Sequence, residues 1–268
     1  MPQKTTIAAL QQMKRDGKKI VGVVLYDCQM ARIVDRAGVD IISVGDSVGV
    51  NMWGHVREDE VTVEQMLLAC TAVRRGVEHA LVSCDVPAAA DPVAAARLFV
   101  SEGGADLVKV EAGPETIRSI VDAGIAVWAQ ISGQGASGRG QGAGGRGQGA
   151  GGRGQEGAAQ EVAGDEVEGI VREAQRLEQA GASLIDFRHS GPVMGAAVAK
   201  ALAIPVIGGL GGGPWLDGRV RAIVNAIGYT AAALDDTADR YANVARTAHD
   251  AVRTYANDVR SGRQVKGK

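Results

Sequence analysis

The chain has 268 residues, 46% of them hydrophobic and 22% charged, so it can bury a full core and is not expected to be disordered as a whole. Its 29 basic and 31 acidic residues leave a formal net charge of -2, which gives no overall attraction to nucleic acid or an anionic membrane. Three distant cysteines match neither a disulfide framework nor a zinc site, and the apolar runs are too short to span a bilayer. These features predict a cytoplasmic protein whose partners are small molecules, with no nucleic acid and no membrane.

Short apolar runs rich in Val and Ile alternate along the chain with longer segments of helical period, which is typical of repeated βα units. A leading helix is predicted at 7–17. The predicted strands cover residues 20–25, 39–45, 80–85, 106–111, 125–131, 183–187, 204–209 and 220–224. Helical patterns are predicted at 28–38, 64–76, 92–104 and 166–181, and a trailing helical segment at 237–260.

This alternation places the protein in the α/β class. Eight strands with intervening helices most simply close into a (β/α)8 TIM barrel, here a single domain over residues 1–268. An open doubly wound sheet is the alternative. In a barrel, the chemistry is expected where strands end and the following loops begin.

Residues 138–155 repeat the seven-residue unit GRGQGAG twice and begin it a third time. They belong to a Gly/Arg/Gln-rich segment, 133–157, that forms an insertion after the fifth strand. The segment has no aromatic residue to stack on bases and only a few arginines, which disfavours single-stranded nucleic-acid binding. Such repetition is typical of a flexible loop.

Polar residues stand at the ends of several predicted strands. Asp46 and Ser47 follow the second strand, Asp85 ends the third, and Lys109 and Glu111 lie on the fourth. Lys109 and Glu111 are two residues apart and therefore share one face of their strand. Inward-facing charge at the rim of a barrel is costly unless it binds something.

The three carboxylates of Asp46, Asp85 and Glu111 come from successive strands and offer only oxygen ligands. Such a set suits Mg²⁺, which usually keeps several waters and also binds oxygens of the substrate. The alternative is that each acid caps the helix that follows it.

Several segments of the chain carry a family resemblance. They are MKRDGKKI, YDCQMARIVDRAGVDIISVGDSVG, VTVEQM, DVP, EGGADLVKVEAG, ETIRSIVDAGI, the AGA before the sixth strand, and IPVIGGLGGGPWLDGRV. In this order they are similar to ketopantoate hydroxymethyltransferase (3-methyl-2-oxobutanoate hydroxymethyltransferase), a family of the phosphoenolpyruvate mutase and isocitrate lyase superfamily. The match covers most of residues 5–127 and much of 165–220.

The resemblance implies that Asp46, Asp85 and Glu111 bind Mg²⁺, and that Asp46, Ser47, Asp85 and Lys109 contact the 2-oxo acid. It also implies the reaction. An enolate of 3-methyl-2-oxobutanoate attacks the one-carbon unit of 5,10-methylenetetrahydrofolate, and 2-dehydropantoate is formed on the way to pantothenate. Magnesium bound to the substrate would stabilise the charge that develops on its keto oxygen. The resemblance further implies a homo-oligomer.

Two positions depart from the family. Ala129-Gln130 stands where the family has a Gly-His pair, and Arg188 aligns with the catalytic Glu. Arginine cannot act as a base at ordinary pH. His189 and Asp186 are the candidates to replace it, although His189 could be an exposed loop residue and Asp186 could pair with Arg188.

These departures leave three hypotheses for function. The leading one is the hydroxymethyl transfer of the family. The first alternative is a folate-independent C–C lyase or mutase of the same superfamily that also acts on a 2-oxo acid. The second is a catalytically silent barrel that serves as a binding partner.

Overall fold

The computed structural model describes residues 4–133 and 164–267, which fall into two compact units. Residues 4–133 and 164–221 form one unit, and residues 222–267 form the other. Except for Gly133, the segment 133–157 lies outside the described residues. The flexible loop and the single domain over 1–268 therefore stay predictions.

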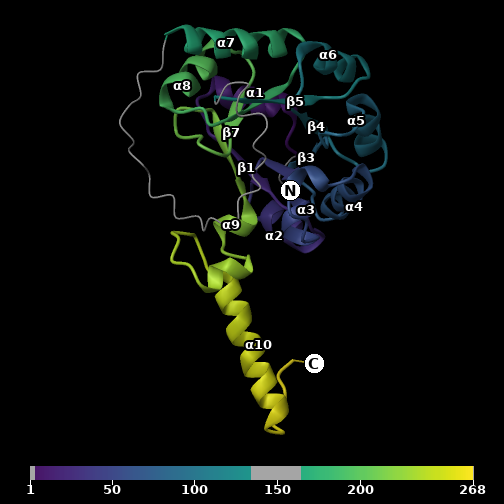
Figure 1. Cartoon of the computed structure of the whole chain (residues 1–268), viewed down its shortest axis with the longest axis vertical. Helices are drawn as coiled ribbons and strands as arrows, with labels where there is room; N and C mark the ends of the chain where they lie inside the picture. Colours follow the sequence, from purple (N-terminus) through teal and green to yellow (C-terminus); the bar gives the residue numbers. More distant parts are fainter. Residues whose placement is uncertain (1–3, 134–163, 268) are drawn as a thin grey trace. The chain divides into compact units, whose positions relative to one another are not determined.

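The first unit is a closed barrel of eight strands, in which consecutive strands are hydrogen-bonded neighbours (Figure 1). The strands are β1 Ile20–Val24, β2 Ile41–Val44, β3 Leu81–Asp85, β4 Leu107–Val110, β5 Val127–Ser132, β6 Leu184–Arg188, β7 Val206–Gly208 and β8 Gly218–Ala222. The seven pairs from β1·β2 to β7·β8 are parallel. The predicted TIM barrel is confirmed, and the open doubly wound sheet is wrong.

The eighth strand begins earlier than predicted. It covers residues 218–222 instead of 220–224, and the apolar Ile223 already starts a helix. A side chain at position 218 would place its Cβ 2.2 Å from the carbonyl oxygen of Ile20, so only glycine allows this close approach to β1. The apolar run in the sequence did not reveal that contact between distant segments.

Helices connect the strands on the outside of the barrel (Figure 1). In this unit they are α1 Ile7–Arg15, α2 Cys28–Arg36, α3 Val48–Met52, η1 Glu58–Glu60, α4 Val63–Arg74, α5 Pro92–Ser101, α6 Pro114–Asp122, α7 Gly164–Gln179 and α8 Pro192–Ala201. Local signals set several of their starts. The Asp27 carboxylate accepts from two backbone N–H groups at the start of α2, and Thr62 and Gln65 form a capping box at the start of α4.

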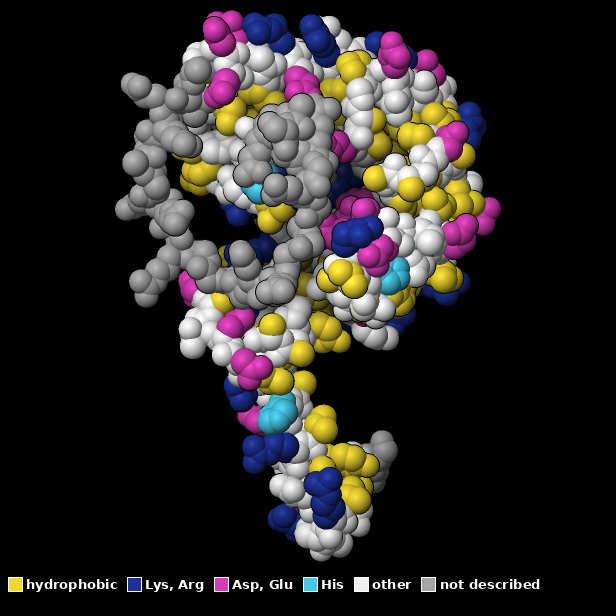
Figure 2. Space-filling model, viewed as in Figure 1, with side chains coloured by type: hydrophobic (Ala, Val, Ile, Leu, Met, Phe, Trp, Pro, Cys, Tyr) yellow, Lys and Arg dark blue, Asp and Glu magenta, His cyan; other side chains and the backbone are white. Residues whose placement is uncertain are grey.

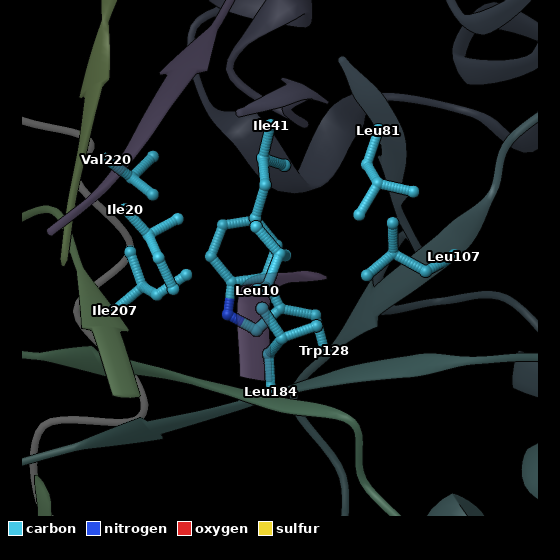
Figure 3. Packing of buried hydrophobic residues seen from close by; sticks show 9 residues of the cluster. All are labelled: Leu10, Ile20, Ile41, Leu81, Leu107, Trp128, Leu184, Ile207 and Val220. Carbon is cyan, nitrogen blue, oxygen red and sulfur yellow. The ribbon is translucent and has the colours of Figure 1, made fainter. Parts of the chain in front are cut away.

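The amino-terminal end of the barrel interior is apolar. Its buried cluster consists of Leu10 from α1 together with Ile20, Ile41, Leu81, Leu107, Trp128, Leu184, Ile207 and Val220 from the strands. Figure 3 shows these side chains pointing toward a common centre. The barrel is therefore a packed core at this end and not a channel.

Two residues further along the strands, the inward positions become polar. On β2 to β6 these positions are Ser43, Ser83, Lys109, Gln130 and Asp186. Side chains two apart on a strand share a face, so this polar layer lies directly above the apolar cluster. The change from apolar to polar places the charged groups at the carboxyl ends of the strands, as predicted.

The second unit contains α9 Ile223–Ala226, η3 Ala231–Leu234 and α10 Val244–Arg260. The trailing helix was predicted from residue 237 but begins seven residues later. The Asn243 side chain accepts from the backbone N–H of Arg246 and so marks the start of α10. No described helix has both the length and the apolar character needed to cross a membrane.

Candidate functional site

The predicted site residues lie at the carboxyl ends of neighbouring strands. Asp46 and Ser47 form the turn between β2 and α3, and Asp85 is the last residue of β3. Lys109 lies in β4, where it is in register with Asp85, and Glu111 follows this strand. Three successive strands therefore bring these five residues to one side of the barrel mouth.

Lys109 is the central cation of the site. Its Nζ lies 2.9 Å from Asp85 Oδ2 and 3.7 Å from Asp186 Oδ2, and all three side chains are at most 10% exposed. The Ser43 hydroxyl donates to Asp85 Oδ1 over 3.2 Å, and the ammonium lies 5.4 Å from the centre of the Trp128 ring. Lys109 thus joins β3, β4 and β6 through buried charge.

Burial and the neighbouring charges together set the pKa values of Asp85 and Lys109. Burial, with Asp46 and Asp186 adding to it, raises the pKa of Asp85 to about 7 although Lys109 opposes the shift. Burial of Lys109 by itself lowers its pKa, but Asp85, Asp186 and Asp46 outweigh this effect and hold the pKa above its usual value. The site would be stabilised by a further cation.

The turn after β2 carries a small network of hydroxyl groups. The Ser47 and Tyr26 hydroxyls are 2.8 Å apart, and the Asn51 amide donates to the Tyr26 hydroxyl over 3.3 Å. A Cβ at Gly45 would lie 3.2 Å from Ser47 Oγ and 3.7 Å from Asp85 Oδ2. The glycine therefore leaves space between the Ser47 hydroxyl and the Asp85 carboxylate.

On the other side of the mouth, β5 and β6 contribute an amide and a second buried carboxylate. Gln130 donates to Glu111 Oε2 over 2.9 Å and is in register with Asp186. Asp186 is 4% exposed, and no partner for its Oδ1 atom is found among the described residues. Burial raises the pKa of Asp186, while Lys109 and Arg188 oppose this shift.

Arg188 ends the same strand, and His189 lies in the turn that follows it. Arg188 is half-buried. His189 has a φ of 51°, and it is the one non-glycine residue in the described ranges with a positive φ. Its N–H donates to the Leu210 carbonyl over 2.6 Å. Burial and the nearby Arg188 lower the pKa of His189, so its imidazole is neutral at neutral pH. His189 is thus a loop residue, as the alternative expected, but it is half-buried and its backbone is constrained.

Glu58, in the 3-10 helix η1, is a further residue of the site that was not predicted. This side chain is half-buried, and burial and Asp46 raise its pKa while Arg188 and Lys109 lower it. These interactions place Glu58 within electrostatic reach of both sides of the mouth. The signal in the sequence was the acidic run Glu58–Glu60 in the loop after the second strand.

The capping explanation of the three acids is wrong. Asp91 and Gly113 occupy the N-cap positions of α5 and α6, and no side chain caps α3. None of Asp46, Asp85 and Glu111 therefore caps the helix that follows it.

The donors at the mouth fit a hydrated magnesium ion. No three His, Cys, Asp or Glu side chains in the described ranges lie close enough to form a complete metal-binding group. The carboxylates nevertheless offer oxygen ligands alone, and those of Asp46, Asp85, Glu111 and Asp186 outnumber the single lysine among them. Mg²⁺ keeps several of its waters and needs few direct protein ligands, so this arrangement suits it better than zinc.

Sequence comparison identifies relatives over almost the whole chain. A sequence model described as ketopantoate hydroxymethyltransferase matches residues 4–264. The 3-methyl-2-oxobutanoate hydroxymethyltransferase of Cyanothece sp. is 35% identical over 266 residues, which cover 96% of this chain and 96% of the relative. Relatives from Shouchella clausii and Acetivibrio thermocellus carry the same name.

Solved structures show the same fold. The chain resembles 2,3-dimethylmalate lyase, described as a PEP mutase/isocitrate lyase superfamily member, with a TM-score of 0.57, 15% identity, and coverage of 97% of this chain and 89% of that one. It also resembles phosphonopyruvate hydrolase in complex with oxalate and Mg²⁺, with a TM-score of 0.56, 16% identity, and coverage of 97% and 88%.

Proposed function

The chain belongs to the ketopantoate hydroxymethyltransferase family, and we propose that it transfers a hydroxymethyl group from 5,10-methylenetetrahydrofolate to a 2-oxo acid in a Mg²⁺-dependent reaction through an enolate. The reference substrate of this reaction is 3-methyl-2-oxobutanoate, which would become 2-dehydropantoate. The observation that carries the proposal is the buried Asp85–Lys109–Asp186 network beside Asp46 and Glu111.

Asp46, Asp85 and Glu111 would hold the magnesium ion. When bound, Mg²⁺ stabilises the negative charge that develops on the keto oxygen of the substrate. A cation bound beside Asp85 would favour its ionised form and so lower the pKa that burial raises to about 7. The related fold of phosphonopyruvate hydrolase was solved with Mg²⁺ and oxalate.

Lys109 and Ser47 would orient the substrate together with Asp46 and Asp85. The Lys109 ammonium is fixed by two carboxylates and retains donor capacity for a substrate oxygen. The Ser47 hydroxyl is oriented by Tyr26, so its position is set before the substrate arrives.

We assign proton removal at C3 to Asp186, and keep His189 as the second candidate. Asp186 faces the barrel interior, and its Oδ1 lacks a partner among the residues that the structure describes. Its raised pKa suits a base that must also release the proton. Its Oδ2 lies near Lys109, and no ion pair between Asp186 and Arg188 is found in the described residues, so the alternative of such a pair is not supported.

The first test is hydrogen exchange at C3 of 3-methyl-2-oxobutanoate in D₂O, followed by NMR with and without Mg²⁺ and without folate. We expect Mg²⁺-dependent exchange above the rate without enzyme, reduced in D186N and retained in H189N. Exchange that survives in D186N but is lost in H189N would reassign the base. No exchange in any of the three proteins would contradict enolate formation and favour a catalytically silent barrel.

The arginine at position 188 favours a second candidate function, that of a lyase or mutase of the same superfamily. The replacement of the family's catalytic glutamate by a cation changes the proton-transfer side of the site. This candidate predicts turnover of a 2-oxo acid without folate. Product analysis with and without 5,10-methylenetetrahydrofolate distinguishes the two reactions.

We also propose a homo-oligomer, as the family resemblance implies. On α10, Ala248, Val252, Tyr255 and Val259 follow one another at intervals of four, three and four residues. Figure 2 shows hydrophobic side chains exposed along this helix, and Val252 and Tyr255 are 64% and 60% exposed. V252D is expected to reduce the mass measured by light scattering, whereas T254D, off the apolar stripe, is not.

A cytoplasmic location completes the proposal. Cys28, Cys70 and Cys84 are all free thiols, which suits a reducing compartment. Fractionation of cells that express the full chain tests this location.

A further inference from the structure

The alternation of side chains along β6 assigns Arg188 to the inward face, at the mouth of the barrel. Arg188 is the last residue of β6 and lies two and four residues beyond Asp186 and Leu184, whose side chains face the interior. Its backbone is fixed, because its carbonyl accepts from the Gly133 N–H over 2.9 Å. On this face, the Arg188 side chain therefore leaves the strand about 7 Å beyond the point at which the Asp186 side chain leaves it.

The Arg188 guanidinium is unpaired within the part of the chain that the structure describes. Among residues 4–133 and 164–267, no hydrogen bond or ion pair involves the Arg188 side chain, although its charge affects the pKa values of Glu58, Asp186 and His189. Arg74 behaves differently, since it pairs with Asp106 over 3.1 Å. A half-buried cation with five unused donors is suited to bind an anion.

We propose that Arg188 binds a second anionic group of the substrate, so that this site prefers a 2-oxo acid with a further carboxylate or phosphonate over the aliphatic 3-methyl-2-oxobutanoate. The inference rests on the proposed function, because it takes the keto-acid end of the substrate to lie beside Lys109. One or two carbons beyond the keto group then carry the second anion up the strand to Arg188.

The surrounding charges support this preference. A second anion would be repelled beside the carboxylates of the mouth, which are those of Asp46, Asp85, Glu111, Asp186 and Glu58. Arg188 lies beyond the polar layer on β6, and its positive charge offsets this repulsion. A guanidinium can form two parallel hydrogen bonds to a carboxylate or a phosphonate, which an aliphatic group cannot accept.

Glu58 provides the competing explanation. In this explanation, Arg188 forms an ion pair with Glu58 in solution and holds the loop of η1 in place. The loss of either residue would then weaken the binding of every substrate equally. If Arg188 binds the substrate, E58Q removes a repulsive charge and leaves the preference for a second anion intact or stronger.

The test is isothermal titration calorimetry in the presence of Mg²⁺ with 2-oxoglutarate, 3-phosphonopyruvate and 3-methyl-2-oxobutanoate. We expect at least one dianionic compound to bind about tenfold or more tightly than the monoanion. R188Q should lower that affinity about 10- to 100-fold and change the affinity for 3-methyl-2-oxobutanoate less than about threefold. The relative affinities of the two dianions show whether a carboxylate or a phosphonate is the natural second group.

R97Q is the matched control, because Arg97 is an exposed arginine on α5. It should bind all three compounds as the unchanged protein does. Equal losses of affinity for all three compounds in R188Q and E58Q would indicate an Arg188–Glu58 ion pair and overturn the proposal. A preference for the monoanion would overturn it as well.

Hydrogen exchange separates this inference from the proposed function. Mg²⁺-dependent exchange of 3-methyl-2-oxobutanoate together with no effect of R188Q on dianion binding would leave the proposed function standing and overturn the role of Arg188. Arg188-dependent dianion binding without exchange of any compound would support Arg188 and contradict the enolate reaction. The absence of binding for all three compounds would contradict both the proposed function and the role of Arg188.

Discussion

The two sides of the barrel mouth differ in how completely their charges are paired. On the β2–β4 side, formed by Asp46, Asp85, Lys109 and Glu111, the buried lysine contacts Asp85 directly. On the β5–β6 side, formed by Gln130, Asp186 and Arg188, one carboxylate oxygen and the guanidinium have no partner among the residues that the structure describes.

The same division separates what resembles the family from what departs from it. Every residue that the resemblance implies for metal and substrate stands on the β2–β4 side, whereas both departures, Gln130 and Arg188, lie on the β5–β6 side. The part of the site that stabilises charge and the part that moves protons and selects the substrate are thus built from different strands. One can change while the other is kept.

The strongest test of the β2–β4 side is Lys109→Met. It leaves Asp85 and Asp186 buried without their cation, and we expect a loss of about 3–5 kcal/mol in the free energy of unfolding at pH 8. Urea denaturation measures the loss, with K200M on the exposed face of α8 as the control. A loss no larger than that of the control would show that the buried charges are not coupled.

Gln130→Leu tests whether the hydrogen bond from Gln130 to Glu111 couples the β5–β6 side to the β2–β4 side. Removing the 2.9 Å hydrogen bond frees the Glu111 carboxylate to rotate, and we expect the affinity for Mg²⁺ to fall about 10- to 100-fold. Calorimetric titration with MgCl₂ measures this affinity, and Q29L on the exposed face of α2 is the control. An unchanged affinity would remove either Glu111 as a ligand or Gln130 as its positioning residue.

Asp186→Asn tests the unpaired carboxylate through the pH dependence of stability. Because burial raises the pKa of Asp186 above 3.8, the folded protein keeps a proton that the unfolded chain has already released. The contribution of this group to stability is therefore full at low pH and is lost as the pH rises above about 4 through the raised value.

The D186N variant lacks this titration and should lose less stability than the unchanged protein over the same interval. Urea denaturation of the metal-free protein in steps from pH 4 to pH 8 gives both curves. Parallel curves would show that Asp186 titrates alike in the folded and unfolded states.

Tyr26→Phe is expected to have the smallest effect. It removes the 2.8 Å hydrogen bond to Ser47 and the bond from Asn51, at a cost of about 1 kcal/mol in stability. If Ser47 contacts the substrate, the KM for the 2-oxo acid should rise by a small factor while kcat stays nearly constant. Y229F, at an exposed tyrosine, controls for the loss of a hydroxyl. A change in kcat alone would mean that the network acts on the reaction step.

The sequence by itself determined the barrel and the β2–β4 side of the site. The alternation of apolar runs and helical periods reports local backbone preferences, and these located all eight strands to within two residues at each end. Asp85 and Lys109 could be predicted to meet because both stand at the ends of adjacent strands whose parallel pairing follows from the fold.

Only the tertiary structure decided how the β5–β6 side is arranged. Whether Asp186 pairs with Lys109 or with Arg188, and whether Glu58 faces the mouth, depends on the distances between strands and loops far apart in the chain. The positive φ of His189 and the early start of β8 likewise come from close contacts with distant backbone. Periodicity reports which face a residue occupies, but burial and the sum of all nearby charges decide its partner and its pKa.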